Sequence, residues 1–120
     1  MISFGTALKS REHPYHRMVV LSDPATNDGW VVLVRVTTHD GTWPDTVCIV
    51  TPADWPQLAH DSTVAYSTAK TGRSTEALLA AIRAGLFDFI PSPSTAVLGK
   101  MVALGKAYSG TPPLAKKWMA

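Results

Sequence analysis

The stretch "WVVLVRVTT", residues 30–38, opens with five apolar residues in a row before Arg35 interrupts the run. β-Branched residues dominate it, which is typical of a buried β-strand. Because side chains alternate along a strand, its even-numbered valines share one face, and we expect that face to point inward. Arg35 and Thr37 share the other face, where they can reach solvent or a substrate. The stretch therefore predicts a strand with one apolar face and one face that carries candidate functional residues.

Shorter strand patterns surround this stretch, and turn residues separate them. Residues 18–21 form an apolar run that ends in Ser-Asp-Pro, and the "NDG" at 27–29 supplies the turn chemistry of a hairpin with residues 30–38. Residues 46–50 and 62–66 predict a third and a fourth strand. Such closely spaced short strands indicate a small antiparallel barrel or a strongly curved sheet.

The second half of the chain has helical patterns instead. Ser74 and Thr75 are candidate N-caps for "STEALLAAIRAGLF", and Gly85 weakens or ends that helix. Pro93 suits the first turn of another helix. That helix carries an apolar stripe at three- and four-residue spacing, formed by Val97, Met101, Leu104 and Tyr108. We therefore expect an α+β fold in a single domain 1–120, with a β-barrel part at 1–70 and a helical part at 71–120.

Composition limits the classes of protein. The chain has 120 residues, one cysteine and a formal net charge of +2, which suits one cytoplasmic domain without a disulfide framework. The N-terminus lacks a secretory h-region, and no apolar run approaches the roughly 20 residues of a membrane span. Cys48 and the four histidines lack metal-ligand spacing, and no glycine-rich phosphate loop is present. We expect no metal and no cofactor.

Three segments, taken in order, resemble the PemK/MazF-like toxins of type II toxin–antitoxin systems. They are "YHRMVVLSDP" (15–24), "GWVVLVRVTT" (29–38) and "CIVTPADWPQLAHDSTVAY" (48–66), and the resemblance covers roughly residues 12–70. It implies an SH3-like curved β-barrel of the MazF/CcdB toxin type, followed by C-terminal helices and usually assembled as a homodimer. It also implies metal-independent cleavage of single-stranded RNA to a 2′,3′-cyclic phosphate, restrained by a partner antitoxin.

The resemblance also nominates catalytic residues. Better-known members have an arginine before the first core strand and a threonine at the end of the next one. Here His16 stands at the place of the arginine, Arg17 follows it, and Thr37 matches the threonine. Three alternatives stay open: His16 has taken over the role, Arg17 performs it from a shifted register, or the activity has been lost.

Metal-free RNA cleavage requires proton transfer and a cation for the phosphate. Histidine suits proton transfer because its pKa of about 6.5 lies near neutrality, and arginine suits the phosphate because its planar fork matches the oxygens. We favour His16 as base or acid, with Arg35 or Arg17 as the phosphate cation. If both His16 and Arg17 already lie in the strand, only one of them can face a given cleft, because neighbouring side chains point to opposite faces. Strand entrances are often irregular, so alternation does not decide between the two residues.

The segment "HDSTVAY" supplies candidate substrate-binding residues. The resemblance implies that Ser62 and Tyr66 line the pocket, and His60 lies just before them. Asp61 can hold an imidazole in one tautomer, or it can form a turn with Ser62.

A second function stays open: a catalytically inactive toxin-like barrel that binds a protein, as gyrase poisons do, or that serves dimerisation. The low net charge and the histidine at the arginine position favour it. The four tryptophans suit either function, because exposed tryptophans stack on RNA bases and also anchor protein interfaces.

Overall fold

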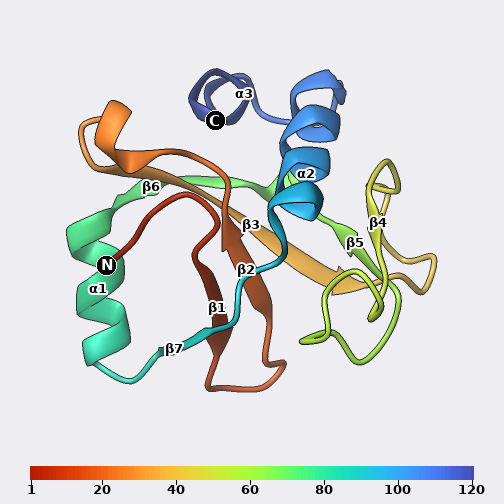
Figure 1. The fold of residues 1–120 in the computed structure, drawn as a ribbon, viewed down its shortest axis with the longest axis horizontal. Helices are drawn as coiled ribbons and strands as arrows, with labels where there is room; N and C mark the ends of the chain where they lie inside the picture. Colours follow the sequence, from red (N-terminus) through yellow and green to blue (C-terminus); the bar gives the residue numbers. More distant parts are fainter.

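A seven-stranded antiparallel sheet organises the chain, which the computed structural model describes in full, from residue 1 to residue 120 (Figure 1). The strand order is β4-β5-β3-β2-β1-β7, and β6 pairs with β3 outside this path. The strands are β1 (Ala7–Ser10), β2 (Arg17–Val20), β3 (Trp30–Thr38), β4 (Ile49–Val50), β5 (Ser62–Val64), β6 (Lys70–Ser74) and β7 (Phe87–Ile90). The α-helices are α1 (Thr75–Arg83), α2 (Thr95–Ala107) and α3 (Pro113–Trp118), and two 3-10 turns lie at Pro24–Thr26 and Tyr66–Thr68.

β3 is the centre of the sheet and has the predicted bounds. One of its edges pairs with β2, with Val34 opposite Val19. The other edge is shared, because β6 pairs with the first half of β3 and β5 with its last three residues. A single long strand therefore joins the whole sheet.

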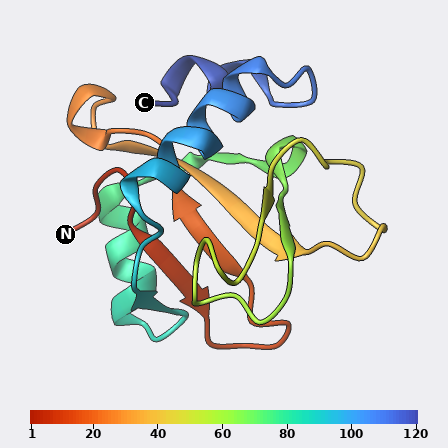
Figure 2. The ribbon, with the colours of Figure 1, turned by 45° about the vertical axis from the view of Figure 1, so that its right-hand side comes forward.

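The two faces of the sheet are covered differently, as two views show (Figures 1 and 2). On the helix-covered face, the even-numbered valines of β3 pack against α2 and α3 in a cluster of 17 buried residues, which confirms that they point inward. On the other face, called the open face below, Val31 and Leu33 pack under Leu78 of α1 in a cluster of six. Because α1 has only nine residues, it covers one end of this face.

Side-chain caps define the ends of the two longer helices. The Ser74 hydroxyl accepts a hydrogen bond from the Ala77 amide at 3.1 Å, which confirms Ser74 as the N-cap of α1. Gly85 follows α1 with a φ of 82°, a left-handed conformation that glycine adopts without a steric penalty. Ser94 caps α2, so Pro93 lies just before the cap and not in the first turn. None of the helices is both long and apolar enough to cross a membrane.

The structure corrects the expected architecture in two respects. The sheet is open, not a closed barrel. The part expected to be helical, residues 71–120, contains β7 and most of β6. Together with β1 these strands escaped prediction because their sequences, "ALKS", "KTGRS" and "FDFI", are short and lack a β-branched run. Pairing with neighbours, a tertiary effect, makes them strands.

Candidate functional site

A small pocket at the end of the sheet brings together most of the predicted site residues. It has a volume of about 80 Å³ and lies where β2 begins, β3 ends and the segment before β5 crosses. Five predicted residues line it: His16, Arg17, Thr37, His60 and Ser62. Its other lining residues are Pro14, Tyr15, Val36, Thr38, Leu58 and Ala59. We call this hollow the strand-end pocket.

Arg17 is the cation of the strand-end pocket. It lies opposite Val36 in the β2–β3 ladder, so it belongs to the helix-covered face. Its Nε atom is buried and has no hydrogen-bond partner. The structure's one ion pair joins Arg11 to Asp88, so no acidic side chain neutralises Arg17. A buried donor without a partner is costly, and an anionic ligand would satisfy it.

His16 is one of the two histidines that line the pocket. Its carbonyl accepts a hydrogen bond from the Ser10 amide at 2.9 Å, so the ladder between β1 and β2 continues one residue before β2. Extending the β2–β3 register places His16 opposite Thr37, on the face opposite Arg17. Because His16 precedes β2 and the pocket lies at the strand ends, both residues nevertheless line it. Burial lowers the pKa of His16, and the positive charge of Arg35 lowers it further. The imidazole is therefore held neutral near pH 7, the state that a general base needs.

The hydroxyl groups of the pocket differ in whether they already form a hydrogen bond within the protein. Thr37 lies opposite Thr63 in the β3–β5 ladder and is partly exposed. The Ser62 hydroxyl donates to the His60 carbonyl at 2.9 Å, which favours the turn interpretation of this segment. The Asp61 carboxylate pairs with no imidazole. Thr37 therefore has the freer hydroxyl.

Tyr66 does not line the pocket. β5 ends at Val64, and Tyr66 begins a 3-10 turn that leaves the strand alternation. Its ring is fully buried, and its hydroxyl donates to the Met101 carbonyl at 2.6 Å. Burial raises the pKa of Tyr66 above its usual value. Tyr66 therefore lies outside the strand-end pocket, and its hydroxyl holds α2 against the sheet.

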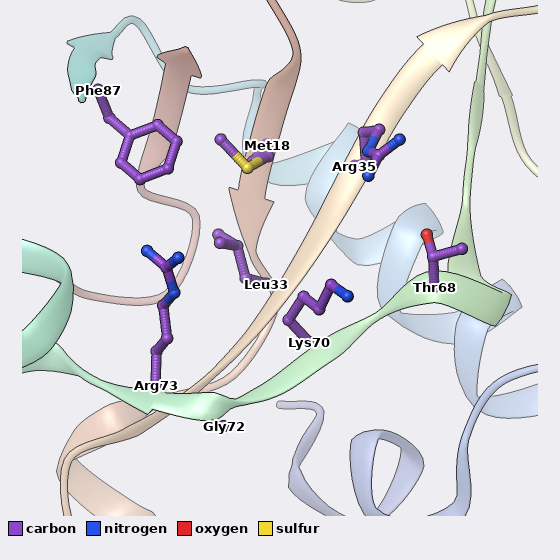
Figure 3. Close-up of a pocket in the computed structure, with 8 residues that line it drawn as sticks. All are labelled: Met18, Leu33, Arg35, Thr68, Lys70, Gly72, Arg73 and Phe87. Atoms are coloured by element: carbon purple, nitrogen blue, oxygen red, sulfur yellow. The ribbon is translucent and has the colours of Figure 1, made fainter. Parts of the chain in front are cut away.

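Arg35 lies outside the strand-end pocket, in a second and larger hollow on the open face (Figure 3). This hollow, called the basic groove below, has a volume of about 360 Å³. It is lined by Met18, Leu33, Arg35, Thr68, Lys70, Gly72, Arg73 and Phe87. Arg35 also lies over the ring of Trp43, 5.7 Å from its centroid. The Arg35 charge also lowers the pKa of His16, which lines the strand-end pocket.

Lys70 and Arg73 are not among the residues predicted from the sequence, because the sequence pattern does not predict their strand. Both lie on β6, where Lys70 pairs with Leu33 and Arg73 with Val31. The available signal was the polar segment "KTGRS", whose cations and glycine are typical of a protected edge strand. The structure holds no group of three or more His, Cys, Asp or Glu side chains that suits a metal ion. Comparisons with protein-family models, curated proteins and solved structures find no match to this chain.

Proposed function

We propose that the chain is a metal-independent endoribonuclease of the PemK/MazF-like toxin type, which cuts single-stranded RNA at the strand-end pocket. One observation carries the proposal. Arg17, whose buried Nε has no hydrogen-bond partner, lines the same small pocket as a histidine with a lowered pKa and a threonine. These groups supply the cation, the base and the hydrogen-bond donor that phosphodiester cleavage needs.

Each residue has a role in the proposed reaction. Neutral His16 removes the proton from the ribose 2′-hydroxyl, and the 2′-oxygen then attacks the phosphorus. Arg17 and the Thr37 hydroxyl donate to the phosphate oxygens as negative charge builds up on them. The protonated His16 or a water returns a proton to the departing 5′-oxygen. The products are a 2′,3′-cyclic phosphate and a free 5′-hydroxyl.

The proposal extends to fold family and partners. In this proposal the open sheet is a variant of the SH3-like toxin barrel. As a toxin of this type, the chain acts in the cytoplasm as a homodimer, and a cognate antitoxin restrains it. Size-exclusion chromatography with light scattering tests the dimer.

The direct experiment incubates the purified chain with a long single-stranded RNA in EDTA. We expect cleavage, and we expect the 5′-ends of the products to accept phosphate from a polynucleotide kinase without prior phosphatase treatment. His16→Ala and Arg17→Ala are expected to lower the rate by about 100-fold or more, the usual cost of removing an acid–base group or a charge-stabilising donor. Arg83→Ala is the matched control, because Arg83 ends α1 and lines neither hollow.

Two results count against the proposal. One is intact RNA with a folded wild-type chain. The other is cleavage that persists equally in His16→Ala, Arg17→Ala and Thr37→Ala, each shown to be folded by circular dichroism.

The protein-binding function has one observation in its favour. Trp30 is 40% exposed and stacks on Trp118, with ring centroids 6.5 Å apart. Exposed paired tryptophans are typical anchors of protein interfaces. A stable protein complex that Trp30→Ala disrupts, together with intact RNA, would favour this function over cleavage.

A further inference from the structure

The basic groove exists because α1 covers only one end of the open face. Leu33 of β3 forms part of its floor beside Met18 of β2. Arg73 of β6 lies over the ring of Phe87 of β7, 5.7 Å from its centroid, although β3, β2 and β1 separate those strands in the sheet. This contact across the curved sheet closes one end of the groove (Figure 3).

The groove concentrates positive charge. Arg35, Lys70 and Arg73 line it, and no acidic residue does. None of the three forms an ion pair, since the structure's one ion pair lies between Arg11 and Asp88. Asp88 is also on β7, opposite Lys9 in the β1–β7 ladder. Because neighbouring side chains on a strand alternate, Asp88 points to the face opposite Phe87. Three cations in one groove exceed the formal net charge of +2 of the whole chain. Such a concentration of like charge favours an anionic ligand.

The floor of the basic groove is apolar, so a ligand that fills the groove needs an apolar part. Met18, Leu33 and Phe87 present a thioether, an aliphatic group and an aromatic ring below the cations. Aromatic rings and methionine sulfur both stack well on planar rings. The volume of about 360 Å³ lies at the lower end of the range of small-molecule sites. An anion alone leaves this floor unused, so the ligand combines a planar apolar group with a negative charge.

We propose that the basic groove binds a nucleotide. Its base lies on Met18 and Leu33, beside the Phe87 ring that Arg73 covers, and its phosphate lies among Arg35, Lys70 and Arg73. A short groove with an apolar floor and clustered cations fits a nucleotide better than an acidic peptide, whose carboxylates are spread along an extended chain. The proposal does not rest on RNA cleavage, because the groove and the strand-end pocket share no lining residue.

The test is isothermal titration of the purified chain with each of the four nucleoside 5′-monophosphates, with adenosine, and with inorganic phosphate. We expect at least one monophosphate to bind more tightly than adenosine or phosphate alone. Lys70→Gln and Arg73→Gln should each weaken that binding by about tenfold or more, because each removes a charge-assisted hydrogen bond. Lys106→Gln is the matched control on the helix-covered side, since Lys106 is an exposed residue of α2.

A second arm separates a free nucleotide from a nucleotide within a strand. A single-stranded deoxyribonucleotide hexamer cannot be cleaved through a 2′-hydroxyl, so it reports binding alone. Tighter binding of the hexamer, lost in Lys70→Gln, identifies a strand as the source, and equal or weaker binding identifies a free nucleotide. The proposal is overturned if neither probe binds, if binding survives Lys70→Gln and Arg73→Gln, or if only an acidic peptide saturates the groove. Nucleotide binding without RNA cleavage would support this proposal and count against the proposed cleavage. RNA cleavage without nucleotide binding in the groove would do the opposite.

Discussion

The helix-covered face and the open face of the sheet are built from alternate residues of the same strands, yet their polar groups are treated differently. Against the helix-covered face, Tyr66 donates to the Met101 carbonyl, and Thr111 donates to the Gly105 carbonyl at 2.7 Å. On the open face, Arg35 and Lys70 line a hollow without an acidic neighbour. Satisfied polar groups stabilise a fold, whereas uncompensated charges favour a ligand. The comparison assigns stability to the part of the helix-covered face beneath α2 and α3. Binding groups lie on the open face and at the strand end, where Arg17 of the helix-covered face has no partner for its Nε.

The largest expected effect is on the free energy of unfolding, which should fall far more for a substitution on the helix-covered face than for one on the open face. Met101 is fully buried between α2 and the sheet, so Met101→Ala should lower the free energy of unfolding by about 2–5 kcal/mol. Lys70→Ala on the open face should change it by less than about 0.5 kcal/mol. Urea unfolding followed by circular dichroism measures both. Similar losses in the two variants would remove the distinction between the faces.

A matched pair of glycines sharpens the comparison within α2. A Cβ at Gly105 would lie 2.6 Å from Cε1 of Tyr66 and 3.0 Å from the Met119 sulfur, whereas a Cβ at Gly99 meets nothing within 4 Å. Gly105→Ala should therefore destabilise the fold by about 1–3 kcal/mol through overpacking. Gly99→Ala should stabilise it by about 0.5–1 kcal/mol through helix propensity. Thermal unfolding of both variants measures this, and a change of the same sign in both would contradict the close packing of α2.

The smallest expected effect is electrostatic and concerns the open face. The Arg35 guanidinium disfavours the protonated imidazole of His16, so Arg35→Gln should raise the pKa of His16. A higher pKa leaves less neutral His16 below neutral pH, so the acid limb of cleavage should move to higher pH. NMR titration of the His16 ring protons measures the pKa. Arg73→Gln is the control, and an equal shift in it, or none in Arg35→Gln, would contradict the coupling.

Much of this comparison follows from the sequence, because it depends on local periodicity. The apolar and β-branched run 30–38 predicts the bounds of β3 and its inward valines, and Ser74 predicts the start of α1. The same alternation separates His16 from Arg17 and brings Thr37 to the pocket rim. These features need no knowledge of distant contacts.

The remainder depends on long-range pairing. The predicted strand 62–66 would put Tyr66 on the face of Ser62. The strand ends at Val64 instead, and Tyr66 begins a 3-10 turn that buries its ring. The basic groove was missed because Lys70 and Arg73 meet Arg35 only through the pairing of β6 with β3. The sequence shows these cations dispersed along the chain, and only the curved sheet gathers them.

The central claim is that the open face and the strand-end pocket bind nucleic acid, whereas the helix-covered face maintains the fold. Amide chemical-shift mapping with a single-stranded deoxyribonucleotide hexamer, in EDTA, tests it most directly. The predicted result is a set of shifts at residues 16–18, at Arg35 and along residues 70–73, with α2 and α3 unchanged. Shifts confined to α2 and α3, or no shifts at a saturating concentration of the hexamer, would contradict it.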